Sequence, residues 1–236
     1  MGTDIHMRAE IKRNGQWEAV GEVFENPYYK ADKPLNDWNK PLTAEPYGDR
    51  NYGLFAMLAN VRNGYGFAGV VTGTGYAPIA EPRGLPEDMS PEVAEWMDSY
   101  DHTPSYLTLA ELESYDWNQV TTRCGEVGRA GYMEWKENGR PSAWCGGSSG
   151  PKVYHVDHAA MDAIIAQLGV PERKHAFDDG EQGWAGGSGA YRTTVEWQES
   201  YADVAGSFLT DTLPKLRELA AADGVTDLRI VFYFDS

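Results

Sequence analysis

The alternating segment near the start of the chain constrains the fold more than any other part of the sequence. Apolar residues alternate there with polar ones, in the order Ile5, Met7, Ala9 and Ile11. A period of two is typical of a β-strand with one buried face. Asn14-Gly15 follows, a dipeptide typical of the type I′ turn between antiparallel strands, and residues 16–20 then alternate again. Residues 4–20 are therefore predicted to form a β-hairpin that places one face on the core.

A second strong signal lies at the other end, where residues 228–234 are almost entirely apolar. Such a run predicts a central strand, with the hairpin and a strand around Val195 as its neighbours. Helical spacing and capping residues predict helices over 50–62, 90–97, 108–115, 157–169 and 201–222, the last broken near Pro214. The expected fold is α+β, with a single mixed sheet, helices packed on it and long Gly/Pro-rich loops.

The chain of 236 residues is expected to form one domain, 1–236, with irregular excursions at about 22–49, 118–151 and 176–190. Its formal net charge of −16 disfavours direct binding to duplex nucleic acid, because a cationic face is needed to release counterions. The same charge is compatible with an acidic inhibitor or DNA mimic that occupies a host enzyme.

The cellular location of the protein is predicted from the absence of membrane-spanning and secretory features in the sequence. No apolar run approaches the roughly 18 residues that span a bilayer, so no membrane association is expected. The first residues have no secretory signal, and the two cysteines lie far apart, which favours a reduced, cytoplasmic protein.

Two segments match known nucleotide-binding and nucleophile motifs, but the elements predicted around them do not fit these functions. Residues 64–69 match GxGxxG but follow a predicted helix instead of a strand, so dinucleotide binding is not expected. Residues 146–150 match GxSxG, but Pro151 and a strand follow where a nucleophile elbow needs a helix. Both segments are predicted to be turns.

The polar face of the first strand carries Asp4 and His6, two residues apart and thus on one side of the strand. If a loop brought His102 to them, the three side chains would form a catalytic metal site for zinc or manganese with an open position for water. A rival cluster occupies residues 155–158. The alternative for the first pair is a hydrogen-bonded Asp and His on an exposed strand face.

Two arginines are candidates for binding an anion. Arg50, with Asn51 and Tyr52, begins a predicted helix, where free backbone N–H groups favour negative ligands. Arg83 lies in a rigid loop between two prolines. Surface salt bridges are the alternative role for both arginines.

Several segments together resemble a family of uncharacterised proteins carried by tailed bacteriophages, prophages and some bacteria. They are the N-terminal Met-Gly-x-Asp-Ile-His motif and residues 50–62, 82–86, 107–109 and 229–235. The resemblance covers most of the chain and is weakest between residues 120 and 191. Family members often have Cys in place of Thr3 and a second His or Ser near His102, so a metal site using those positions is incomplete here.

The resemblance implies a phage-type protein that acts in the cytoplasm of a bacterial host cell. We expect it to bind a small anionic ligand, such as a nucleotide or a nucleotide immune signal, and to counter host defence by sequestration. Arg50 and Arg83 would meet the negative group, and Asp4, His6 and His102 would line the pocket floor. The alternatives are a metal-dependent hydrolase of a nucleotide or related phosphoester, and the acidic inhibitor or DNA mimic. The sequence also leaves a homo-oligomer open.

Overall fold

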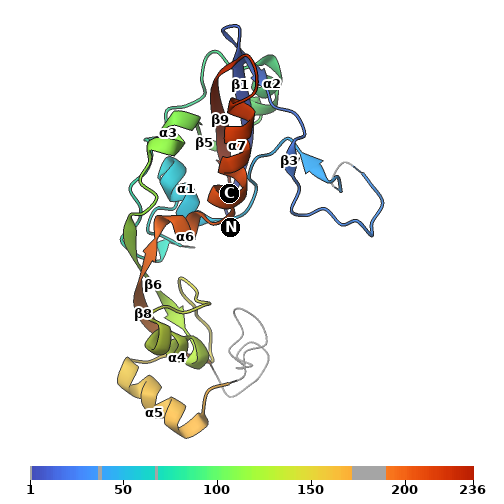
Figure 1. Ribbon diagram of the computed structural model, residues 1–236. Coiled ribbons are helices and arrows are strands. Elements are labelled where there is room, and N and C mark those ends of the chain that lie inside the picture. The colour runs from blue at the N-terminus through green and yellow to red at the C-terminus, as the bar shows by residue number, and fades with distance from the viewer. Residues whose placement is uncertain (1, 37–38, 67–68, 172–189) are drawn as a thin grey trace. The chain divides into compact units, whose positions relative to one another are not determined.

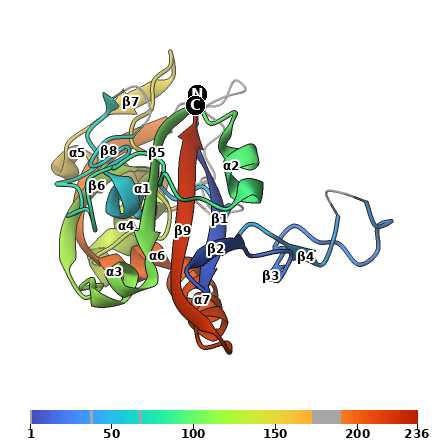
Figure 2. The same cartoon turned by 90° about the horizontal axis from the view of Figure 1, so that it is seen from above.

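The first and last strands pair with each other at the centre of a four-stranded antiparallel sheet (Figures 1 and 2). The computed structural model describes residues 2–36, 39–66, 69–171 and 190–236. In sheet order the strands are β2 (Gln16–Ala19), β1 (Asp4–Arg13), β9 (Val225–Asp235) and β5 (His102–Thr108). Asn14 and Gly15 have φ angles of 49° and 80°, as a type I′ turn requires. The predicted hairpin and central strand are confirmed.

The predicted neighbour of the central strand is wrong in one respect. The strand around Val195, β8 (Ala190–Ser200), belongs to another sheet, and β5 lies beside β9 in its place. The segment that carries His102 was expected to be a loop, yet β5 begins at His102 and contains Pro104, which cannot donate to a ladder. An edge strand tolerates this proline, and the β5–β9 register shifts between His102 and Ser105.

Helices cover both faces of β9, which explains its apolar sequence. Phe55 of α1 (Tyr52–Ala59) packs against Phe234 on one face, with ring centroids 5.1 Å apart. Val93 and Met97 of α2 (Pro91–Met97) pack against Val231, whose side chain points to the other face. α2 begins where the sequence predicted it, with Ser90 as its N-cap, whereas α1 lies inside the predicted range 50–62 and begins only at Tyr52.

The remaining elements of this part of the chain are short. The excursion 22–49 is irregular apart from β3 (Phe24–Glu25) and β4 (Leu42–Thr43), while the capping box predicted for residues 108–111 begins α3 (Leu109–Ser114). The long helical region divides into α6 (Tyr201–Ala205), a π-helical turn η2 (Phe208–Thr212) and α7 (Leu213–Ala220). The break lies at Gly206, whose φ is 50°, and not near Pro214 as predicted. At Pro214, in the first turn of α7, the helix changes from π to α geometry without a break.

The chain divides into two compact units where one domain was expected over 1–236. The first contains Met1–Asn63, Ala77–Asn118 and Ala202–Ser236, and the second contains Gly64–Tyr76 and Gln119–Tyr201.

The second unit has its own mixed sheet and core. Its strands lie in the order β6 (Val120–Val127), β8 and β7 (Val153–His155), with β7 parallel to β8. Buried side chains from the sheet, α4 (Arg129–Asn138) and α5 (His158–Leu168) form the core, namely Val127, Tyr132, Met161, Val195 and Trp197. The α+β class with a mixed sheet is thus confirmed, although the strands form three sheets in the described residues.

One expected loop of the second unit is wrong and another is not described. Residues 118–151 contain β6 and α4, whose glycines conceal them in the sequence. Gly128 and Gly139 cap α4, and Gly139 has the left-handed φ of 76° that commonly ends a helix. The excursion 176–190 lies outside the described residues except for Ala190, which begins β8. Among the described helices, none is long and apolar enough to cross a membrane.

Candidate functional site

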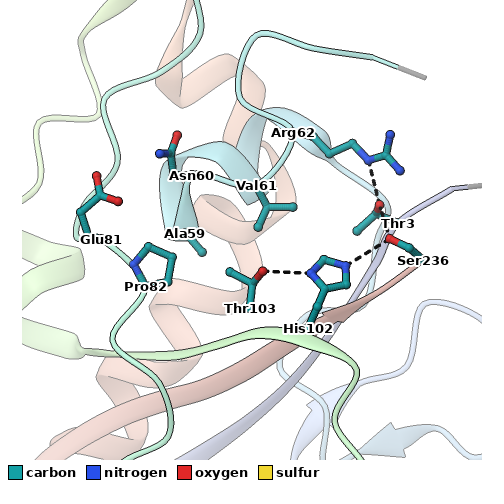
Figure 3. A pocket seen from close by; sticks show the side chains of 10 residues that line it. All are labelled: Thr3, Ala59, Asn60, Val61, Arg62, Glu81, Pro82, His102, Thr103 and Ser236. Atoms are coloured by element: carbon teal, nitrogen blue, oxygen red, sulfur yellow. Dashed lines mark hydrogen bonds between the residues drawn. The ribbon is translucent and has the colours of Figure 1, made fainter. Parts of the chain in front are cut away.

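A polar cavity of about 440 Å³ lies at the end of the main sheet where β1 begins and β9 ends (Figure 3). This volume is within the range of small-molecule sites. The end of α1, the start of β5 and the loop before α2 complete the walls. The lining residues are Thr3, Ala59, Asn60, Val61, Arg62, Glu81, Pro82, His102, Thr103 and Ser236.

A continuous series of hydrogen bonds crosses one wall of the cavity (Figure 3). Arg62 Nε donates to Thr3 Oγ1 over 2.8 Å, and Thr3 Oγ1 lies 3.1 Å from Ser236 Oγ. Ser236 Oγ lies 3.1 Å from His102 Nε2, and His102 Nδ1 lies 2.9 Å from Thr103 Oγ1. We call these five side chains the Arg62–Thr103 series. It joins a cation, an imidazole and three hydroxyls on one surface.

The end of α1 places Arg62 in the cavity. Asn60 ends this helix with a φ of 57°, and Arg62 also has a left-handed φ, of 55°. Tyr52, at the other end of the helix, accepts a hydrogen bond from the backbone N–H of Thr3 over 3.2 Å. The Arg62 guanidinium lies over the Tyr52 ring, 5.3 Å from its centroid. Tyr52 therefore supports the site, although it does not line it.

Thr103 has a φ of 50°, a conformation that is strained for a β-branched residue. Such strain costs on the order of 1–3 kcal/mol and persists where the surrounding structure enforces it, most often at functional sites. The register shift between β5 and β9 falls between His102 and Ser105, the interval that contains Thr103. The strained backbone thus coincides with the polar wall of the cavity.

The structure does not bring His102 to Asp4 and His6. His102 pairs with Phe234, and Phe234 pairs with Ile5, so these three side chains point to one face of the sheet. Asp4 and His6 flank Ile5 and point to the other face. No group of at least three His, Cys, Asp or Glu residues in the described parts of the chain could hold a metal ion. The three-ligand zinc or manganese site is therefore wrong, and the metal-dependent hydrolase loses its basis.

His6 has contacts of its own on that opposite face. Its Nε2 lies 3.1 Å from Asp235 Oδ2, its Nδ1 lies 3.8 Å from Glu45 Oε1, and its ring stacks on Tyr233 at 4.8 Å. Burial raises the pKa of the Glu45 carboxyl. A hydrogen-bonded His and Asp on the strand face was the alternative expected, but the partner is Asp235 and not Asp4.

The two predicted anion-binding arginines are neutralised by carboxylates and do not line the cavity. Arg50 donates from Nε and Nη2 to the two oxygens of Asp4, over 2.7 and 2.6 Å, and these bonds lower the pKa of Asp4. Arg83 Nη2 donates to Glu111 Oε1 over 2.6 Å. Asn51 caps α1 by accepting from the backbone of Leu54, which is a structural role. Salt bridging, the alternative role, describes both arginines.

The rival cluster in the second unit does not converge either. His155 Nδ1 lies 3.3 Å from Glu126 Oε1, and its Nε2 lies 3.1 Å from the carbonyl oxygen of Ser148. His158 instead meets a backbone carbonyl of β8, and Asp157 caps α5. These side chains serve separate structural contacts.

No protein-family model, no curated protein and no solved structure matches this chain. The candidate site is accordingly defined by its own geometry. Of its polar residues, the sequence singled out only His102 directly, and the family resemblance drew attention to position 3. Arg62 lies at the end of the resembling segment 50–62 but was given no role, and neither were Thr103 and Ser236, because each depends on a backbone turn or on the pairing of distant strands.

Proposed function

We propose that this chain binds a small anionic ligand of nucleotide size in the cavity beside the Arg62–Thr103 series. The observation that supports this proposal is the convergence of the Arg62 guanidinium, the His102 imidazole and three hydroxyls on one wall. A guanidinium matches the geometry of phosphate and carboxylate groups, and hydroxyls donate to their remaining oxygens.

Direct contacts must carry the affinity, because the whole chain has a formal net charge of −16. At physiological ionic strength the Debye length is about 8 Å, so the repulsion from distant carboxylates is largely screened. A ligand within hydrogen-bonding distance of Arg62 experiences the local donors more strongly than the overall charge.

The biological role that we propose is the one that the phage-family resemblance implies. The ligand would be a nucleotide or a nucleotide immune signal in the cytoplasm of a bacterial host, and its capture would counter defence. The position of the anion differs from the sequence-based prediction, because Arg62 replaces Arg50 and Arg83 as the cationic group.

Isothermal titration calorimetry with inorganic phosphate, AMP and ATP tests the binding proposal. Hydrogen bonds to charged groups are worth about 1.5–3 kcal/mol, so Arg62→Gln should weaken binding by about 10-fold to 150-fold. Arg83→Gln is the matched control, since it removes the same charge outside the cavity, and it should change affinity less than twofold. Equal losses in both variants, or no binding of any of these anions by the unmodified chain, would refute the proposal.

A further inference from the structure

We propose that Ser236 is a nucleophile, and His102 its general base, for the cleavage of a phosphate ester bound in this cavity. This inference rests on the proposed function, since it requires the anion to be held beside Arg62. It goes further, because binding alone requires no reacting group.

The geometry of a nucleophile and its base is present. Ser236 Oγ lies 3.1 Å from His102 Nε2, within the range for direct proton transfer between a hydroxyl and an imidazole. Ser236 is exposed and lines the cavity, where a ligand would lie beside it. The backbone N–H of Ser236 donates to Asp101 Oδ2 over 3.2 Å, which fixes the residue at the end of β9.

The other members of the series direct the hydrogens. In the tautomer with hydrogen on Nδ1, His102 donates to Thr103 Oγ1, and Nε2 is left to accept from Ser236. Arg62 can only donate, so Thr3 Oγ1 accepts from it and can direct its own hydrogen to Ser236 Oγ. The hydrogen of Ser236 then points at the imidazole. Thr103 acts here as a positioning residue, held in place by its strained backbone.

The reaction consumes a phosphate ester and water. Ser236 Oγ attacks phosphorus, its proton passes to His102 Nε2, and the bond from phosphorus to the ester oxygen breaks. His102 returns this proton to the departing alkoxide, which leaves as an alcohol. Water then attacks the phosphorus of the phosphoserine and gives a proton to His102 Nε2. The bond from phosphorus to Ser236 Oγ breaks, and His102 returns the proton to this oxygen, which releases the phosphate product and restores the serine hydroxyl. Arg62 would neutralise charge on the phosphoryl oxygens in both steps.

A fluorophosphonate probe tests the nucleophile directly, because the same attack at phosphorus displaces fluoride and leaves a stable adduct. We expect one adduct per chain by intact mass, mapped to Ser236 by peptide sequencing and absent in Ser236→Ala. General bases contribute about 10²–10⁴-fold, so His102→Gln should slow labelling by at least about 100-fold. The matched control is Ser148→Ala, which removes a serine hydrogen-bonded to Glu126 in the second unit and should label normally.

Thr103 is tested by a pair of variants. Thr103→Ser keeps the hydroxyl and should retain the rate and pH profile of labelling, whereas Thr103→Val should lower the rate and displace the profile. Equal profiles in the two variants would overturn the role of this residue.

Release of p-nitrophenolate from bis(p-nitrophenyl) phosphate tests turnover, while calorimetry with AMP follows binding. Ser236→Ala should abolish release and still bind AMP, with Arg62→Gln weakening that binding. If the unmodified chain binds AMP but neither labels nor releases nitrophenolate, the catalytic inference fails and the binding proposal stands. If it does not bind any anion, label or turn over, both fail. An adduct on another residue also overturns the inference.

Discussion

The central sheet contains a buried ion pair that allows a quantitative test of how this fold is held together. Glu10 and Arg229 are 0% and 3% exposed, and Arg229 Nε donates to Glu10 Oε2 over 2.7 Å. Glu10 Oε1 accepts from the backbone N–H of Ser90 over 2.6 Å, and Arg229 also binds Asp88 over 2.7 Å. The ring of Trp17 lies 3.9 Å from the guanidinium carbon. Every charge of the pair is therefore met by a partner.

Arg229→Met removes the cation at nearly constant volume. The Glu10 carboxylate then stays buried and still accepts a hydrogen bond from the backbone N–H of Ser90. Removing one member of a buried pair costs about 3–5 kcal/mol. Adding Glu10→Gln to this variant removes the charge, and the amide oxygen can still accept from Ser90. The double variant should then lose only about 1–3 kcal/mol, the cost of imperfectly paired neutral groups. The second substitution is thus expected to recover part of the stability that the first one removes.

Urea unfolding followed by circular dichroism measures these losses, and hydrogen exchange of peptides from β1 and β9 locates them. Each kcal/mol corresponds to about 2–4 °C in melting temperature at 150–250 residues, so Arg229→Met should melt about 6–20 °C lower. The control is Arg13→Met, which breaks the exposed Arg13–Glu18 pair of the same hairpin and should cost less than about 1 kcal/mol. A loss in Arg229→Met no larger than the control, or an additive further loss in the double variant, would refute the reasoning.

Two titrations provide further predictions. Arg50→Ala should raise the pKa of Asp4 toward its ordinary value of about 3.9, because the Arg50 hydrogen bonds lower it. The lowered pKa stabilises the fold above that ordinary value, and this contribution disappears as the pH falls through the lowered pKa; carboxyl NMR titration of both proteins measures it. Burial raises the pKa of Tyr47 and of Tyr76 to about 12, so phenolate absorbance should show both tyrosines ionising late. Their contribution to stability is complete below the unfolded value of about 10 and is lost as the pH rises toward 12; ordinary titration of both would contradict this.

Local signals in the sequence predicted those parts of the fold that local chemistry determines. A type I′ turn requires two left-handed residues, and Asn14-Gly15 supplies them, which fixes the hairpin turn. The side chains of Ser90 and Asp157 determine where α2 and α5 begin. These features need no knowledge of the rest of the chain. The strands β5 and β6 were missed because Pro104 and the glycines after residue 124 oppose strand formation locally. Pairing with β9 and β8 overrides that preference.

The candidate site was only partly predictable, because it depends on strand register and backbone turns. His102 was identified as a chemical group, yet its partner Ser236 comes from the last strand, and Thr3, which contacts Ser236, comes from the other end of the chain. Thr103 follows His102 directly in the sequence, but its left-handed backbone could not be predicted, because threonine rarely adopts a positive φ. Arg62 likewise enters the cavity through an unusual turn after α1.

The register shift in β5 between His102 and Ser105 is a β-bulge, and it explains why the predicted metal site does not form and why His102 lines the cavity. Leu107 and Ser105 pair with Ile230 and Phe232, so strict alternation would place Thr103 beside Phe234 and turn His102 toward the face of Asp4 and His6. One extra residue in β5 reverses this, and His102 pairs with Phe234 instead. The strain at Thr103 is thus the cost of moving an imidazole from one face of the sheet to the other. Regular pairing would avoid the strained backbone of Thr103. Strain of this kind is typical of functional sites, and here it places His102 beside Ser236, which supports a chemical role for this end of the sheet.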